Sequence, residues 1–197
     1  MRKTYFDYYG KYAAETPDKV LLRIDENTLT YQEFMEMTAR LGSGMQKLGI
    51  NPNDKVGIIM PNSIEWYLVY WAAIRIGAQP VPMDPQSGSL ELSRLIPATT
   101  VKICFLAERY RNNRIIDAVS ALVPGQLSQD KCICFAPQEA LPADPVFITE
   151  DTFLRDYCGM ECAPFTPEPE HTMSLACTSG STGTPKVLAV PYEGFLI

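Results

Sequence analysis

A short segment near the end of the chain, residues 175–186 (LACTSGSTGTPK), combines hydroxyl residues, glycines and one lysine. Gly180 and Gly183 allow the backbone to turn with its N–H groups exposed, and Lys186 adds a positive charge. The side-chain hydroxyls belong to Thr178, Ser179, Ser181, Thr182 and Thr184. A bound polyphosphate requires many hydrogen-bond donors, a close approach of the backbone and a cation. The segment therefore predicts a phosphate-binding loop.

Two other interpretations of this segment explain fewer of its residues. A flexible Ser/Gly linker would leave the lysine and the apolar runs on either side without a role. A Walker A loop, G-x-x-x-x-G-K-[ST], would need glycine at Pro185 and a hydroxyl residue at Val187. The residues after Lys186, VLAV, also favour a strand, whereas a helix follows a Walker A loop. We therefore expect a strand on each side of the loop.

The cysteines and the single histidine do not predict a metal site or a general base. Cys132, Cys134, Cys158 and Cys162 form C-x-C followed by C-x-x-x-C, a spacing that matches no common zinc site. The remaining two cysteines lie in apolar runs, so all six are expected to be reduced thiols. His171 has no second histidine to join it, and neither a ligand nor a general-base role is expected for it.

The composition is that of a globular, acidic chain. It has 197 residues, 46% hydrophobic content and a net charge of −6, with no basic run that would attract nucleic acid or an anionic membrane. No apolar stretch reaches the length of a membrane span, and the N-terminus lacks the apolar centre of a signal peptide. We expect a cytoplasmic protein.

Apolar runs of strand length alternate along the chain with amphipathic helical patterns. The expected strands are 20–24, 55–60, 80–83, 101–107 and 131–135, and the expected helices are 4–14, 30–48, 62–76, 88–97 and 111–123. Thr30 and Glu33 form a capping-box pattern at one helix start, and Gly42 and Gly44 inside that helix predict close packing against another element. The alternation predicts the α/β class, with a mostly parallel sheet covered by helices and right-handed crossovers.

Three regions follow from this pattern. Residues 1–135 form the α/β sheet unit, and residues 136–170 are a proline-rich surface connection with one short helix near 150–158, because prolines cannot donate to a sheet. Residues 171–197 form the phosphate-loop segment, where the sheet resumes at MSLACT. The chain stops soon after this segment.

The LACTSGSTGTPK segment resembles the signature of the adenylate-forming (AMP-binding) superfamily, which includes acyl-CoA synthetases and the adenylation domains of nonribosomal peptide synthetases. Earlier segments, LTYQEF, NPNDKVGIIMPNSIEW and IRIGAQPVPMDP, resemble family motifs in the same order. The resemblance implies the N-terminal subdomain of the acetyl-CoA synthetase-like fold. It also implies that the ATP phosphates are held by Thr178, Ser179, Gly180, Ser181, Thr182, Gly183 and Lys186.

The reaction implied by the resemblance is the attack of a substrate carboxylate on the α-phosphorus of Mg·ATP. It gives an acyl-adenylate and pyrophosphate, and the acyl group then passes to a thiol. Family members carry their adenine pocket, acidic Mg²⁺ ligand, acyl pocket and catalytic lysine after the phosphate loop, so catalytic residues are expected beyond Ile197. Val187 and Tyr192 depart from the residues that many members have after the motif lysine.

The resemblance leaves three readings of function open. The first is a truncated, N-terminal part of an acyl-CoA synthetase-like ligase, inactive alone, with coenzyme A as the acyl acceptor and exposed apolar surface that favours self-association. The second is an amino-acid adenylation domain that serves the phosphopantetheine of a carrier protein, which Asp84-Pro85 favours. The third is a non-catalytic nucleotide-binding or interaction module. The residues that would identify the acid lie beyond this sequence.

Overall fold

The computed structural model describes residues 4–123, 125–127, 131–135, 147–159, 161–168, 170–178 and 186–192. Its helices are α1 (Tyr5–Glu15), α2 (Tyr31–Lys47), α3 (Ile64–Arg75), α4 (Ser89–Thr99), α5 (Ile115–Ser120) and α6 (Glu150–Asp156). Its strands are β1 (Val20–Ile24), β2 (Asn27–Thr30), β3 (Lys55–Ile59), β4 (Gln79–Pro82), β5 (Val101–Ala107), β6 (Cys132–Phe135), β7 (Ile148–Thr149), β8 (Thr172–Thr178) and β9 (Lys186–Pro191).

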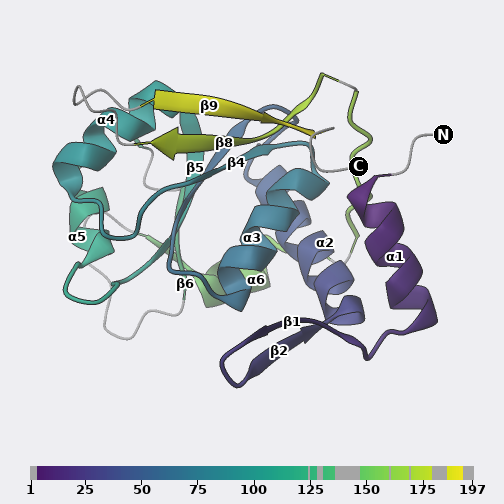
Figure 1. Cartoon of the computed structure of the whole chain (residues 1–197). Coiled ribbons are helices and arrows are strands. Elements are labelled where there is room, and N and C mark those ends of the chain that lie inside the picture. Colours follow the sequence, from purple (N-terminus) through teal and green to yellow (C-terminus); the bar gives the residue numbers. More distant parts are fainter. Residues whose placement is uncertain are drawn as a thin grey trace.

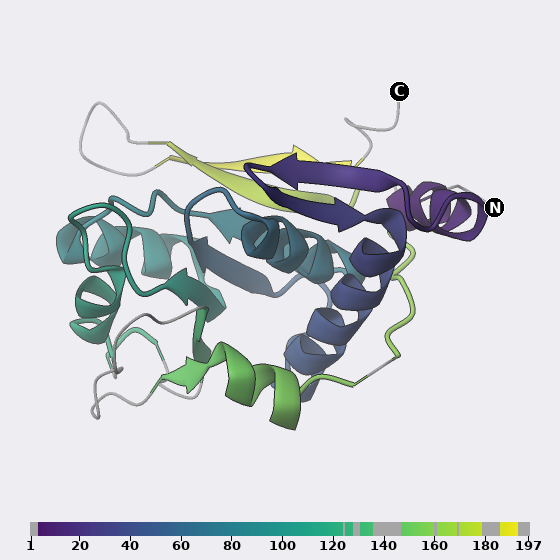
Figure 2. The ribbon, with the colours of Figure 1, turned by 90° about the horizontal axis from the view of Figure 1, so that it is seen from below.

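Five parallel strands form the central sheet, in the order β4-β3-β5-β6-β7. Apolar side chains cover both faces of this sheet, which explains why its strands are nearly continuous apolar runs. Helices α1, α2, α3 and α6 pack over one face, and α4 and α5 cover the other (Figures 1 and 2). The predicted α/β class with a parallel, helix-covered sheet is confirmed.

The helix ends follow local signals in the sequence. Thr30 caps α2 with the expected box: its Oγ1 accepts from the backbone N–H of Glu33 at 3.2 Å, and its own N–H donates to the Glu33 carboxylate at 2.8 Å. Ser63 caps α3, and Gly77 follows that helix with φ of +75°, a conformation that favours glycine. No helix in the described ranges is long and apolar enough to cross a membrane.

Three elements differ from the sequence-based expectation. Helix α5 begins at Ile115 instead of residue 111, because Arg111 has φ of +53° and the Asn113 side chain donates to the backbone of a neighbouring loop at Pro85, 2.8 Å away. The short strand β7 lies within 136–170 and adds a fifth strand to the sheet. Strand β2, which was not expected, forms an antiparallel hairpin with β1.

The sheet does not resume at MSLACT, contrary to expectation. Strand β8 pairs with β9 in a separate two-stranded antiparallel sheet. The outer border of β4 explains this. The N–H groups of Gln79 and Met83 donate inward, to the carbonyls of Asp54 directly before β3 and of Ile58 on β3, at 2.8 and 2.9 Å. The alternate positions, Pro80 and Pro82, therefore face outward. Proline has no N–H to donate, so this border cannot supply the donors of a further ladder.

Candidate phosphate-binding site

The predicted phosphate loop lies between the facing ends of two paired strands. Thr178, the last residue of β8, pairs with Lys186, the first residue of β9, and Cys177 pairs with Val187. The two strands predicted on either side of residues 179–185 are confirmed. Lys186 is exposed at this end of the hairpin. Five of the predicted site residues, Ser179, Gly180, Ser181, Thr182 and Gly183, lie outside the described residues, and the role of all seven stays a prediction.

The β8–β9 hairpin lies beside β4 and packs against both apolar cores, one on each face of the central sheet. Met173 is buried in the core formed with α1, α2 and α3, and Leu175 and Cys177 pack against the core on the α4 and α5 face. Ser174 is 4% exposed and lies close to the Tyr70 side chain of α3. The loop end of the hairpin lies toward α4 (Figures 1 and 2). Side-chain contacts, not a backbone ladder, therefore hold the described strands of the hairpin against the body of the molecule.

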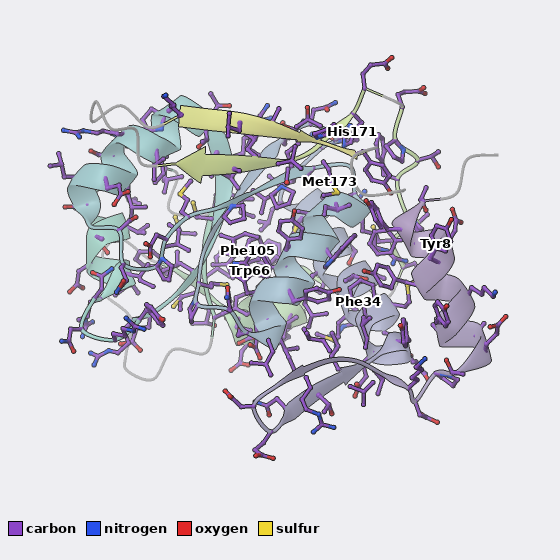
Figure 3. All side chains as sticks on the ribbon, in the orientation of Figure 1. Tyr8, Phe34, Trp66, Phe105, His171 and Met173 are labelled. Atoms are coloured by element: carbon purple, nitrogen blue, oxygen red, sulfur yellow. The ribbon has the colours of Figure 1, made fainter. Side chains whose placement is uncertain are left out.

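An aromatic group fixes the opposite end of the hairpin. The backbone N–H of Tyr192 donates to the His171 carbonyl at 3.0 Å, and the Tyr192 hydroxyl accepts from the backbone N–H of Tyr5 at 3.2 Å. The His171 ring lies 5.2 Å from that of Phe165 and 6.4 Å from that of Tyr192. Figure 3 labels His171 and Met173 near this end of the hairpin. Burial lowers the pKa of His171, which keeps the imidazole neutral at neutral pH and fits a packing role.

Arg75 anchors the segment that leads into β8, residues 158–168, which we call the strap. Its Nε donates to the Cys162 carbonyl at 2.7 Å, and its own carbonyl accepts from the Phe165 N–H at 2.6 Å. Sequence reasoning did not single out this residue. The available signal was a charged side chain inside the apolar run WAAIRIG, which only a buried partner explains.

The hairpin is suited to binding and positioning anions. Its described strands carry hydroxyl residues and Lys186 but no carboxylate, so they match the phosphates and do not supply an acidic magnesium ligand. Cys177 lies one residue before Thr178, but burial raises its pKa, so the thiol stays protonated and is a poor nucleophile. The chemistry that this arrangement supports is electrostatic: it can hold a polyphosphate and offset its charge.

Comparison with known sequences identifies the family. Residues 10–196 match the family described as AMP-binding enzyme. The chain is 26% identical to tyrocidine synthase 3 of Brevibacillus parabrevis over 195 residues. This alignment covers 98% of this chain and 3% of that protein. It is 24% identical to 4-coumarate-CoA ligase 2 of Petroselinum crispum over 169 residues. This alignment covers 86% of this chain and 29% of that protein.

Comparison with solved structures agrees at the level of the fold. The anthranilate CoA ligase AuaEII, solved in complex with anthranoyl-AMP, matches with a TM-score of 0.80 and 16% identity over 97% of this chain and 35% of that chain. This chain thus spans only a minor part of each protein named. Because the family match takes in nearly all of its residues, the chain belongs to the AMP-binding enzyme family.

Proposed function

We propose that this chain holds the phosphates of ATP in an AMP-forming ligase that activates a carboxylic acid. The observation that carries the proposal is the β8–β9 hairpin, whose facing ends, Thr178 and Lys186, flank a loop rich in hydroxyl and glycine residues. The family match over residues 10–196 supports ATP as the nucleotide. Small-molecule carboxylic acids are the proposed substrates.

In the proposed reaction a carboxylate oxygen of the acid attacks the α-phosphorus of ATP. The bond between that phosphorus and the bridging oxygen of pyrophosphate breaks, which leaves an acyl-adenylate and pyrophosphate. Loop donors and Lys186 hold the β- and γ-phosphates and offset the charge that builds on the leaving group. Mg²⁺ would add positive charge near the phosphates, but the described strands β8 and β9 supply no carboxylate to hold it. A thiol then takes the acyl group and releases AMP.

We propose coenzyme A as the thiol acceptor. The match to 4-coumarate-CoA ligase 2 supports this choice. A second candidate is amino-acid adenylation for the phosphopantetheine thiol of a carrier protein. The match to tyrocidine synthase 3, which covers 98% of this chain, supports it. The two candidates share the adenylation step and differ in the acid and in the acceptor.

We propose further that these 197 residues alone do not complete the reaction. The chain covers 29% of 4-coumarate-CoA ligase 2 and 35% of the AuaEII chain, so most of each relative has no counterpart here. The hairpin also carries no carboxylate that could hold Mg²⁺. A complete active site on this reading needs additional residues.

The test is acid-dependent exchange of labelled pyrophosphate into ATP, with panels of aryl, fatty and amino acids. It compares the 197-residue chain with the protein purified from its own cell, whose intact mass is measured in parallel. We expect exchange only from a protein well above 22.0 kDa, and a loss of about 100-fold when Lys186 is replaced by alanine. Lys11→Ala, at an exposed position of α1, is the control and should leave the rate unchanged.

Exchange catalysed by the 197-residue chain would overturn the proposed inactivity. A natural protein of 22.0 kDa that binds ATP without exchange for any acid would overturn the ligase proposal and favour a nucleotide-binding module. Exchange with amino acids alone would select the second candidate over the first.

A further inference from the structure

Two tyrosine rings from different helices meet at one corner of the molecule. Tyr12 lies in the last turn of α1, and Tyr31 is the first residue of α2. Their ring centres are 5.2 Å apart and their planes are inclined by 34°, which places the rings in contact. Tyr12 is 41% exposed, and Tyr31 is half-buried. The pair therefore combines ring contact with access from solvent.

Hydrogen bonds of the neighbouring backbone hold both tyrosines at this corner. The N–H of Thr16, the C-cap residue of α1, donates to the Tyr12 carbonyl at 2.8 Å. The N–H of Tyr31 donates to the Lys19 carbonyl at 3.1 Å, so the start of α2 is bonded to the segment that leaves α1. The Lys19 ammonium also lies 5.6 Å from the centre of the Tyr12 ring. The fold thus sets the separation of the two side chains.

Packing in the core explains the inner rings of this aromatic group better than it explains Tyr12. The ring centre of Tyr9 lies 4.6 Å from that of Phe34 and 5.3 Å from that of Trp71. Tyr12 lies outside these contacts and keeps much of its surface in water. An oxidant in solution can reach an exposed phenol, and water can accept its hydroxyl proton. The outer pair is therefore placed for oxidation of its rings.

Two other tyrosine contacts are enclosed and are poorer sites for oxidation. The ring centres of Tyr5 and Tyr192 are 5.0 Å apart, but Tyr192 is only 6% exposed. The hydroxyls of Tyr9 and Tyr67 lie 3.4 Å apart inside the aromatic group. Burial raises the pKa of Tyr5 to about 12 and raises that of Tyr9 as well, so neither hydroxyl gives up its proton readily. A dissolved oxidant should therefore select the outer pair.

We propose that Tyr12 and Tyr31 form an oxidative modification site, at which a one-electron oxidant joins α1 to α2 through a dityrosine bond. Each phenol gives one electron to the oxidant and its hydroxyl proton to water, which leaves two phenoxyl radicals. A carbon–carbon bond forms between the ring positions next to the hydroxyl-bearing carbons, and the hydrogens at these positions move to the oxygens. The protein thus loses two electrons and two protons, and two equivalents of oxidant are reduced. The site does not depend on the phosphate loop.

The geometry of the corner favours coupling within one chain. An exposed side chain changes rotamer within nanoseconds, so the Tyr12 ring can turn its reactive edge toward Tyr31. Two groups in one chain meet at an effective concentration of about 1 mM or more, far above that of dilute protein. The new bond closes a loop from residue 12 to residue 31, and it persists when the chain unfolds. The modification is therefore a permanent link between the two helices.

The test is light-driven oxidation of the 197-residue chain by a ruthenium tris-bipyridyl complex, with persulfate as the final electron acceptor. The protein is kept at about 1 μM, where coupling within one chain prevails. Trypsin places the two tyrosines in separate peptides, residues 12–19 and 24–40, and neither peptide contains another tyrosine. We expect mass spectrometry to find these peptides joined, with the loss of two hydrogen atoms, as the main dityrosine product.

Phenylalanine variants test which phenols react. Tyr12→Phe and Tyr31→Phe keep the aromatic rings and remove the hydroxyls, so each should abolish the joined peptide. Tyr8→Phe is the matched control, because Tyr8 lies one turn before Tyr12 on α1, is 47% exposed and is labelled in Figure 3. It should leave the yield unchanged. Circular dichroism shows whether each variant is folded.

Oxidation in urea shows whether the fold selects this pair. In the unfolded chain the links should spread over its ten tyrosines, and the preference for peptides 12–19 and 24–40 should be lost. The same product pattern with and without urea would overturn the proposal. So would a folded chain whose main product joins other tyrosines or joins two chains, or an equal loss of product in Tyr8→Phe.

Discussion

At the scale of single residues, buried polar side chains join segments that are distant in the sequence. Arg75 is 7% exposed, and its guanidinium donates to the Cys162 carbonyl at 2.7 Å and to the Thr38 hydroxyl at 3.4 Å. It also lies 4.9 Å from the centre of the Phe6 ring. Burial lowers the pKa of Arg75, yet a guanidinium remains protonated in proteins, so these contacts must compensate for lost water. Arg75 thus connects α1, α2 and the strap to α3.

Arg75→Met is expected to destabilise the fold by about 2 kcal/mol, because the charge-assisted hydrogen bonds to the strap and to α2 are lost while the apolar stem is kept. Urea unfolding measures this change as a lower transition midpoint. Arg94→Met, at an exposed position of α4, is the control and should change stability by less than about 0.5 kcal/mol. Equal effects of the two substitutions would contradict a structural role for Arg75.

His171 should make stability depend on pH. Burial lowers its folded-state pKa below the ordinary value of 6.5, so the folded chain favours the neutral ring. Above pH 6.5 the His171 ring is neutral in both states, and its packing contributes fully to stability. As the pH falls below 6.5, stability is lost because the unfolded chain binds the proton more readily than the folded chain does. Unfolding free energies measured from about pH 7.5 down to about pH 5 test this.

His171→Phe keeps an aromatic ring between Phe165 and Tyr192 but removes the titrating group. Its stability should fall less over the same pH range than that of the unaltered chain. Because both proteins keep all other titrating groups, the difference between the two curves isolates His171. Parallel curves would show that this residue does not cause the loss.

At the scale of elements, local signals predict helices and central strands well. Helix α2 begins at Thr30 because Thr30 and Glu33 satisfy each other, and β3 and β5 are recognisable as continuous apolar runs. These features depend on neighbours in the sequence. The hydroxyl-rich loop was recognised in the same way, because the residues that suit phosphates are contiguous.

Features that depend on contacts between distant segments were not predictable in this way. Strand β7 has only two residues, Ile148 and Thr149, and is a strand because β6 lies beside it. The separation of β8 from the central sheet depends on the direction in which the prolines of β4 face. The pairing of β4 with β3 sets this direction. The contact between Tyr12 and Tyr31 joins two helices, so no contiguous motif marks it.

Gly44→Ala tests the close packing of α2 against α6 and the strap. An added Cβ would lie 2.7 Å from Sγ of Cys158 and 2.7 Å from Cζ of Phe153. Overpacking of this kind costs about 1–3 kcal/mol and exceeds the gain of up to about 1 kcal/mol that alanine brings to a helix. We expect a net loss of about 1 kcal/mol in urea unfolding.

Gly10→Ala in α1 is the matched control for this substitution. Its added Cβ would lie 3.6 Å from Cε of Met35, an ordinary contact, so only the helix preference of alanine remains. It should stabilise the chain by up to about 1 kcal/mol. If both alanine variants shift stability in the same direction, packing at Gly44 is not the cause.

At the scale of the whole molecule, one border of the hairpin pairs with no strand in the part of the chain that the structure describes. Strand β9 pairs with β8 and with no other described strand, and Leu188 on it is 55% exposed. Exposed strand borders with apolar side chains pair readily with other chains. We propose that this chain, taken alone, self-associates through β9.

Sedimentation velocity over about a 100-fold range of concentration tests this proposal, with species larger than the 22.0 kDa monomer expected at the upper end. Leu188→Lys should shift the distribution back toward the monomer, because a charge on the open strand opposes pairing. Leu90→Lys on α4, where the leucine is 67% exposed, should have little effect. A monomer at all concentrations, or a larger effect of Leu90→Lys, would contradict association through β9.

The proline border of β4 has a mechanical consequence for the molecule. Pro80 and Pro82 leave a seam between the central sheet and the hairpin, which side-chain packing holds closed. A backbone ladder loaded along its strands resists shear with all of its hydrogen bonds at once, whereas packed side chains part a few at a time. Tension applied at Tyr192 should therefore peel the hairpin from the body of the molecule while the five-stranded sheet stays intact.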